Sequence, residues 1–238
     1  MTPDTAQHLL ALNRQFYDQF AGDFSDSRRT PQPGFGPALA WLDGAARLVD
    51  VGCGDGRVAQ IVPQSVGAYV GVDFSVGLLG QQRGARTGLA VRMVAADISQ
   101  VGWAARVGGQ YDAAVCFSTL HHLPGRATRA TALREMGQLL VPGARVVVSV
   151  WQPLGQARFA GKTVAWESVG LTERDVEAGD VLLSWERGGK GVRYVHHFEV
   201  EELAGLLGDC GYTVVGHYRS DGKTGDLGLY VQAVWGGG

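Results

Sequence analysis

The glycine-rich segment 48–57 constrains the fold more than any other part of the sequence. It begins with a near-continuous apolar run, which is typical of a strand covered on both faces. The run ends in Gly52, Gly54 and Gly56, and apolar residues at helical spacing follow over 58–62. Because glycine lacks a Cβ, it permits a tight turn and the close approach of a ligand to the backbone. A strand, a glycine turn and a helix in this order predict a nucleotide-binding α/β fold.

Three successive strand segments end in or carry an aspartate, which narrows the class of nucleotide. These are Asp50 before the first glycine, Asp73 at the end of 68–73 and Asp97 at the end of 91–97. The G-x-G-x-G spacing matches neither the dinucleotide motif nor the P-loop. Asp73 lies roughly 20 residues beyond the glycines, where a carboxylate can reach ribose hydroxyls. A crevice lined by carboxylates suits a cationic nucleoside, and the pattern resembles the class I S-adenosylmethionine (SAM) methyltransferases.

Residues at or beside these strand ends are expected to bind SAM and to release S-adenosylhomocysteine. The alternative for each aspartate is that it only caps the loop or helix that follows. For the two cysteines of the set, the alternative is a small buried side chain. The expected donor-binding residues are Tyr17, Asp50, Gly52, Cys53, Gly54, Asp73, Phe74, Asp97, Ile98, Cys116 and Phe117.

A histidine pair follows the fourth predicted strand, 111–118, and is the candidate acceptor site. Methyl transfer requires an acceptor atom held in line with the methyl group, and a base only if the nucleophile carries a proton. His121 and His122 could orient the acceptor, present positive charge to an anion or act as a base. The alternative is one histidine in the core and one at the surface. No metal ligand set accompanies the pair, and His196–His197 is a weaker candidate.

Composition bounds the class of protein. The 238 residues are 45% hydrophobic and 18% charged, which is typical of a globular protein with a sizeable core. The net charge of −2 gives no strong nucleic-acid footprint. Three widely spaced cysteines indicate neither a zinc site nor a disulfide framework. We find no signal peptide and no apolar run long enough to span a membrane, so a reduced cytoplasm is the expected location.

The order of elements predicts one domain with a mostly parallel, seven-stranded Rossmann-like sheet and an antiparallel C-terminal edge strand. Residues 1–44 are expected to form a helical cover over the donor, or simply a packing helix and a linker. Residues 152–195 are rich in glycine and charge and poor in periodicity, so we expect an insertion near the acceptor site without its own core. The other predicted helices are 75–85, 126–140 and 200–207, and the other predicted strands are 145–151, 212–218 and 227–235.

Most of the chain resembles a narrower family, the tRNA wobble-uridine carboxymethyl methyltransferases. The glycine motif is specific only to the wider class, whereas the N-terminal Ser–x–Ser–Arg loop, the histidine pair and an Arg–Tyr–x–His–x–Phe stretch are more specific. The residues that carry the resemblance are Tyr17, Phe24, Ser25, Ser27, Arg28, Pro31, Pro33, the segment 49–54, Asp73, His121, His122, Arg129, Ala132, Leu133, Glu135, Val150, Trp151, the segment 164–166, Arg193, Tyr194, His196, Phe198, Glu202 and Leu203.

The resemblance implies SAM as donor and a carboxylate of a modified tRNA uridine as nucleophile, guided by Arg28 and the histidine pair. It also implies a small activator subunit as a partner. The sequence departs from the family at Gln32, Ala165 and residues 222–226, so the acceptor pocket can differ. A small-molecule acceptor and a non-catalytic SAM-binding role therefore remain as alternatives. A basic rim for tRNA, or only a solvated helix face, would be made by Arg28, Arg29, Arg126, Arg129 and Arg134.

Overall fold

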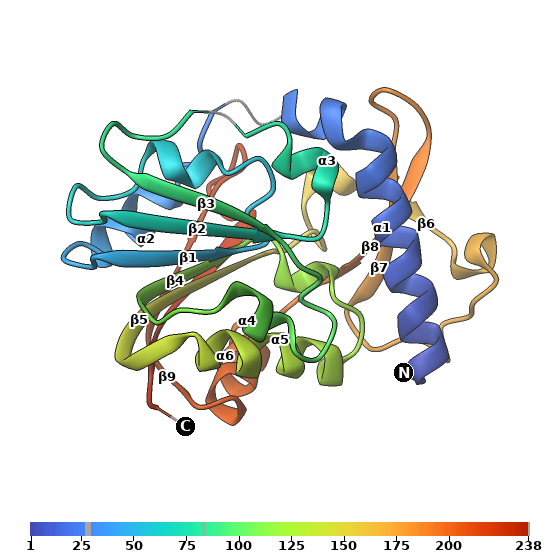
Figure 1. Ribbon diagram of the computed structural model, residues 1–238. Helices are drawn as coiled ribbons and strands as arrows, with labels where there is room; N and C mark the ends of the chain where they lie inside the picture. Colours follow the sequence, from blue (N-terminus) through green and yellow to red (C-terminus); the bar gives the residue numbers. More distant parts are fainter. Residues whose placement is uncertain (27–29, 83, 238) are drawn as a thin grey trace.

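The computed structural model describes residues 1–26, 30–82 and 84–237, apart from the side chain of Phe24. A seven-stranded sheet in the order β3-β2-β1-β4-β5-β10-β9 forms its centre (Figure 1). Strands β1 to β5 pair in parallel, and β10 lies antiparallel between β5 and the edge strand β9. The predicted fold class is therefore confirmed, with the antiparallel strand one place inside the edge. The strands are β1 (Arg47–Val51), β2 (Ala68–Asp73), β3 (Ala90–Ala95), β4 (Tyr111–Phe117), β5 (Leu140–Trp151), β9 (Tyr212–Ser220) and β10 (Gly228–Trp235).

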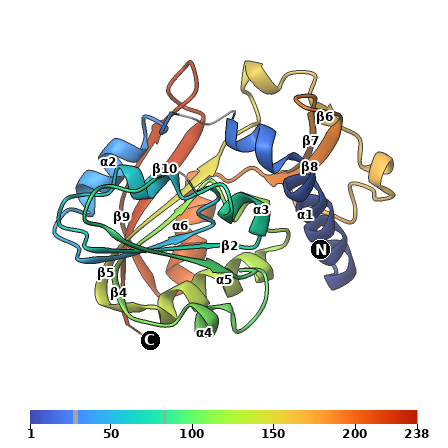
Figure 2. The ribbon, with the colours of Figure 1, turned by 45° about the horizontal axis from the view of Figure 1, so that its top comes forward.

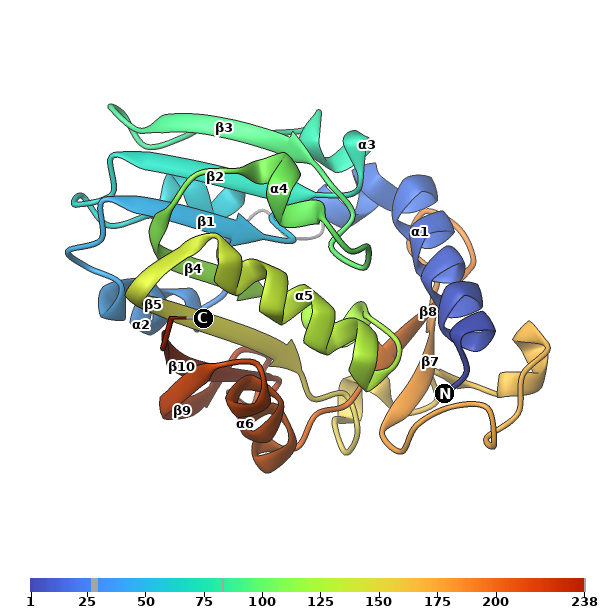
Figure 3. The ribbon, with the colours of Figure 1, turned by 60° about the horizontal axis from the view of Figure 1, so that its bottom comes forward.

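Both faces of the sheet are buried, which explains the continuous apolar character of its central strands. Successive residues of β1 point to opposite faces: Leu48 packs in one cluster with Phe35 and Leu39, and Val49 packs in the other with Leu133. Helices α4, α5 and α6 cover one face, and α2 lies on the other (Figure 3). The short turn η1 packs with α2 on that second face. These elements are α2 (Phe35–Trp41), η1 (Arg57–Gln60), α4 (Trp103–Val107), α5 (Arg126–Gln138) and α6 (Val200–Asp209).

Helix α1 (Pro3–Asp26) and a second, three-stranded sheet lie beyond the carboxyl ends of the parallel strands (Figures 1 and 2). Leu9, Phe16 and Phe20 recur at helical spacing along α1 and are buried. The small sheet consists of β6 (Thr163–Val164), β7 (Asp180–Trp185) and β8 (Gly191–His196). No helix among the described residues has the combined length and apolar character needed to cross a bilayer.

Two predicted helices are much shorter than expected. The segment after the glycine turn forms only η1, because Pro63 disfavours the helical conformation in the residue before it. The helix predicted over 75–85 is reduced to α3 (Val76–Leu79), and Gly80 and Gly84 are poor helix formers. Conversely, the predicted helices do not include α4, which begins at Trp103. Glu135 accepts hydrogen bonds from the backbone N–H groups at the start of α4.

The segment 152–195 contains regular strands that the sequence does not predict. Leu182 of β7 packs with Leu9 and Tyr194 on one side of the small sheet, whereas its neighbours on β7 pack with Trp151 on the other. Because both faces are covered, β7 shows no alternation of polar and apolar residues. The small sheet shares its core with α1 and the end of β5. These two elements supply the apolar contacts that the segment 152–195 does not provide by itself.

Candidate methyl-donor and acceptor site

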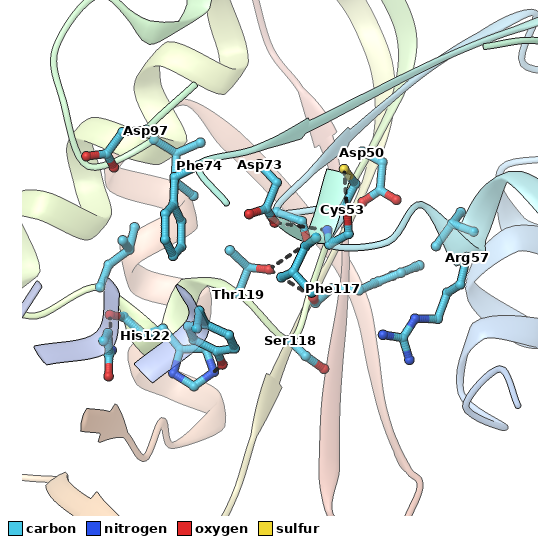
Figure 4. A pocket seen from close by; sticks show the side chains of 18 of the residues that line it. Asp50, Cys53, Arg57, Asp73, Phe74, Asp97, Phe117, Ser118, Thr119 and His122 are labelled. Carbon is cyan, nitrogen blue, oxygen red and sulfur yellow. Dashed lines mark hydrogen bonds between the residues drawn. The ribbon is translucent and has the colours of Figure 1, made fainter. Parts of the chain in front are cut away.

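A cleft lies at the carboxyl ends of β1, β2 and β4, where the strand order changes direction (Figure 4). Ligands of open α/β sheets bind at such switch points. Helix α1 closes one side of the cleft through Leu10, Arg14 and Tyr17. Of the predicted site residues, those that line it are Tyr17, Asp50, Gly52, Cys53, Gly54, Asp73, Phe74, Asp97, Ile98, Phe117 and His122.

The glycine turn forms the floor of this cleft. Gly52, Gly54 and Gly56 have φ values of 76°, 57° and 68°, a region in which residues with side chains are strained. A Cβ on Gly52 would lie 2.2 Å from the Thr119 hydroxyl oxygen, so this position also requires the absence of a side chain for packing. A Cβ on Gly54 would meet no protein atom within 4 Å, although Gly54 lines the cleft. The turn therefore leaves bare backbone exposed to a ligand.

The carboxylate of Asp73 sits directly above the turn. One oxygen accepts a hydrogen bond of 2.9 Å from the Gly54 N–H, and the other accepts one of 2.9 Å from the Ser75 N–H. Burial raises the pKa of Asp73 to about 6 in spite of these bonds. The Phe74 backbone also bonds to this carboxylate, which has about four acceptor sites in all, so Asp73 keeps room for a further hydroxyl donor. This geometry fits a ribose diol.

Asp50 lies deeper, at 1% exposure, and is the second acid of the cleft. The Tyr69 hydroxyl donates a 2.6 Å hydrogen bond to it. Burial, with a further contribution from Asp73, raises the pKa of Asp50 to about 7. The same burial and the two acids raise the pKa of the Cys53 thiol well above its ordinary value. Asp50 and Asp73 repel one another, and the Cys53 thiol stays protonated. A cationic ligand is therefore favoured in this part of the cleft.

Asp97, which follows β3, forms an ion pair with the N-terminal helix α1. Its carboxylate forms a 2.5 Å ion pair with Arg14 and accepts hydrogen bonds from the Ser99 backbone and hydroxyl. The Arg14 guanidinium also lies 5.8 Å from the centre of the Phe74 ring. A ligand in the cleft would therefore be enclosed between the sheet and α1 at this end.

His122 lies at the opposite end of the cleft, and its hydrogen bonds fix its tautomer. Nδ1 is 3.1 Å from the backbone carbonyl of Tyr194, which can only accept, so Nδ1 carries a proton. Nε2 is 2.7 Å from the Tyr17 hydroxyl, which donates to it when the imidazole is neutral. Asn13 of α1 holds the backbone around this pair through bonds to His122 and Tyr194. The arrangement favours an orienting role for His122 over a charged one.

Two predicted site residues do not reach the cleft. His121 is fully buried, stacks on Trp151 and accepts a hydrogen bond from the Trp151 backbone N–H. Cys116 is 2% exposed in the main core, where burial raises the pKa of its thiol to about 12. Adjacent residues on a strand point to opposite faces, so Phe117 lines the cleft while Cys116 faces the helices. These positions correspond to the alternatives stated for each residue.

One residue of the predicted basic rim, Arg129, does not lie at the surface. Arg129 is 1% exposed and forms a 2.6 Å ion pair with Glu177, so it belongs to the interior. Arg126 is exposed but is paired with Asp209. Arg28 and Arg29 lie outside the described residues.

His196 belongs to a buried network rather than to the cleft. Its Nδ1 is 2.7 Å from Asp180 and its Nε2 is 2.9 Å from Glu202, while the Tyr194 hydroxyl also donates to Asp180. Glu177, Asp180 and His196 present potential metal-ligand atoms within 4.8 Å of one another. Since Arg129 already neutralises Glu177 and protein donors occupy Asp180, this cluster serves to join β7, β8 and α6.

Sequence reasoning missed several residues of the site. Thr119 lines the cleft, and its hydroxyl donates a 3.2 Å hydrogen bond to the Gly52 carbonyl oxygen. Ser118, the residue before it, also lines the cleft and has a φ of 52°. Asn13 and Arg14 face the site only because α1 folds across the strand ends. Nothing in their local pattern distinguishes them from the polar face of a surface helix.

Comparisons with known proteins agree with this geometry. A family model described as a methyltransferase domain matches residues 49–146. A protein of Encephalitozoon cuniculi named for an inferred methyltransferase activity is 28% identical over 207 residues, covering 85% of this chain and 88% of the relative. A tRNA (carboxymethyluridine(34)-5-O)-methyltransferase of Xenopus tropicalis is 31% identical over 161 residues, covering 63% of this chain and 23% of the relative. The magnesium protoporphyrin IX methyltransferase of Synechocystis with bound SAM superposes with a TM-score of 0.59 at 16% identity, covering 99% of this chain and 98% of the other.

The domain match and the sheet order define the class of protein: residues 49–146 match a methyltransferase domain, and the chain has the Rossmann-like class I fold of solved SAM-dependent methyltransferases. SAM is the ligand bound in the Synechocystis structure. Within this class the chain is similar to the tRNA carboxymethyluridine methyltransferases, and it spans less than a quarter of the length of the Xenopus relative.

Proposed function

We propose that the protein transfers the methyl group of SAM to a carboxylate oxygen of a carboxymethylated wobble uridine in tRNA. The observation that carries the proposal is the state of His122, whose Nε2 accepts a hydrogen bond from Tyr17 and so is engaged rather than poised to take a proton. A carboxylate is ionised at neutral pH and needs no base. The similarity to relatives named for this reaction supports the same acceptor.

In the proposed reaction SAM supplies a methyl group on a sulfonium. A carboxylate oxygen forms the new C–O bond as the C–S bond breaks, its electron pair passing to sulfur. One anion and one cation become a neutral ester and a neutral thioether, and no proton moves. The task of the protein is to hold the two reacting atoms in line and to exclude water.

We assign the residues of the cleft to this task as follows. Asp73 accepts hydrogen bonds from the ribose hydroxyls, and the bare backbone at Gly54 allows the nucleoside to approach. Asp97 and Phe74 enclose the base between the strand tips and α1. His122 and Tyr17 orient the acceptor at the other end.

The test uses purified protein, tritium-labelled SAM and a cell extract separated into RNA, protein and small-molecule fractions. Label in tRNA that mild base releases, as expected of a methyl ester, would support the proposal. Stable label in tRNA would point to another atom, and an absence of label in every fraction would point to a non-catalytic SAM-binding protein. A parallel reaction with the small partner subunit of the resembled family added separates an inactive protein from one that needs an activator.

A small-molecule carboxylate is the second candidate acceptor. It is favoured by the net charge of −2 and by the burial of Arg129, both of which weaken a phosphate-binding surface. Binding of bulk tRNA measured over a range of salt concentrations distinguishes the two acceptors. A steep fall in affinity with salt supports tRNA, whereas an absence of binding at low salt supports the small molecule.

A further inference from the structure

A buried arginine lies next to the acceptor end of the cleft. Arg193 of β8 is 4% exposed, and its Nε and Nη1 atoms have no hydrogen-bond partner among the residues that the structure describes. Buried charges in proteins are normally paired, because an isolated charge is poorly stabilised away from water. The unfilled donors of Arg193 therefore indicate a missing anion.

The surroundings of Arg193 are aromatic rather than acidic. Its guanidinium carbon lies 4.7 Å from the ring centre of Trp151 and 5.3 Å from those of Phe16 and Trp185. Burial lowers the pKa of Arg193, and the charge of Arg158 lowers it further. Aromatic rings stabilise a cation and fix its orientation, but they do not neutralise its charge. We call this set, Phe16, Trp151, Trp185 and Arg193, the arginine box.

One hydrogen-bonded chain connects the arginine box to the cleft. Arg193 donates to the Tyr17 hydroxyl, which in turn lies 2.7 Å from Nε2 of His122. Trp151 is also an edge-on neighbour of His122, with ring centres 5.8 Å apart. Tyr17 and His122 line the cleft, so Arg193 stands one side chain behind the place where the acceptor is proposed to bind.

We propose that Arg193 binds the carboxylate of the methyl acceptor. This inference rests on the proposed function, in which the nucleophile is a carboxylate oxygen. The planar guanidinium matches a carboxylate, so its free N–H groups can hold one oxygen while the other faces the methyl group. Once the ester has formed, its negative charge is gone and the attraction to Arg193 weakens, which favours product release.

The experiment measures anion binding to the full chain saturated with S-adenosylhomocysteine. Acetate is the probe and acetamide is its neutral counterpart of the same shape, and tryptophan fluorescence reports the occupancy of the box through Trp151 and Trp185. The variants are Arg193→Met, Arg193→Lys and the matched control Arg187→Met, which changes an exposed arginine in the β7–β8 loop.

We expect saturable binding of acetate but not of acetamide to the wild type and to the control. Arg193→Met should weaken acetate binding at least about tenfold, as expected for the loss of a charge-assisted hydrogen bond. Arg193→Lys should retain the preference for acetate at lower affinity. In every variant the affinity for S-adenosylhomocysteine should stay within about twofold of the wild type, since donor contacts are unchanged.

Thermal unfolding separates anion binding from a structural role. Removal of an unpaired buried charge leaves the unfolding temperature of Arg193→Met equal to or above that of the wild type. A structural arginine would instead give a lower unfolding temperature and an unchanged response to acetate, which would overturn the proposal. Equal responses to acetate and acetamide in the wild type would also overturn it.

The outcome is distinguishable from that of the proposed function. If base-labile label enters tRNA and Arg193→Met labels tRNA as fast as the wild type, the role of Arg193 is wrong and the function stands. If no label enters tRNA but acetate binding depends on Arg193, the acceptor is another carboxylate.

Discussion

Replacement of Asp50 by asparagine is expected to stabilise the protein in a way that depends on pH. The side chain is buried, and its pKa rises from 3.8 to about 7 because burial disfavours the charged form. Between these two values the unfolded chain has lost the proton while the folded protein keeps it. The free energy of unfolding of the wild type therefore falls as pH rises from about 4 to about 7 and is level above that range.

The size of the effect follows from the pKa shift. A shift of about three pH units corresponds to about 4 kcal/mol at about pH 8, of which less than half is already present at about pH 5. Asparagine keeps an oxygen to accept from Tyr69 and has no charge to desolvate. We therefore expect the advantage of Asp50→Asn over the wild type to grow by about 3 kcal/mol between about pH 5 and about pH 8.

Urea unfolding without ligand at the two pH values measures this difference directly. Asp18→Asn, which alters an exposed carboxylate of α1, is the control and should show no such growth. Addition of SAM should narrow the gap, because the cation offsets the charge of Asp50 in the wild type only. An advantage of Asp50→Asn that is the same at both pH values would refute the reasoning.

Three further outcomes follow from the cleft. Asp73→Ala should weaken SAM binding by about 1–3 kcal/mol, since it removes the proposed acceptor for the ribose hydroxyls, and calorimetry that finds unchanged affinity would contradict this assignment. His122→Ala should lower the rate of methyl transfer and leave the dissociation constant of SAM nearly unchanged, a pattern that single-turnover kinetics with labelled SAM would show; a normal rate places the acceptor elsewhere. Gly52→Ala should destabilise the fold by more than about 1 kcal/mol through its positive φ and its contact with Thr119, and Thr119→Ala should recover part of that loss in chemical denaturation.

The predictions that succeeded depend on local chemistry that few folds share. A buried strand, spaced glycines and an acid at each of the following strand tips are enough to predict a mostly parallel Rossmann-like sheet, and they place the expected donor-binding residues at the carboxyl ends of its strands. The separation of Cys116 from Phe117 follows from the alternation of side chains along β4, whereas His121 and His122 lie in a short helical turn after the strand. The alternation of side chains can be predicted from the sequence. The sequence does not show which of the two faces borders the cleft.

The acceptor end could not be predicted because its residues come from distant segments. Asn13 of α1 meets Tyr194 of β8 through hydrogen bonds that join positions 181 apart in sequence. The strands that carry this contact are covered on both faces and give no periodic signal. The sequence around Arg193 gives no signal of its own beyond the family resemblance, because its aromatic neighbours come from α1, β5 and the small sheet.

Helix α1 supplies Arg14 to one end of the cleft and Asn13 with Tyr17 to the other. Because one helix contacts both the donor end and the acceptor end of the cleft, the two ends are coupled. A movement of α1 that admits the nucleoside also loosens the contacts that hold the acceptor. Steady-state kinetics should accordingly follow a compulsory order, with the sulfonium entering first and its thioether leaving last. Replacement of α1 by the N-terminal helix of another protein would then change the preference for the acceptor, while the sheet would still bind the ribose of the donor.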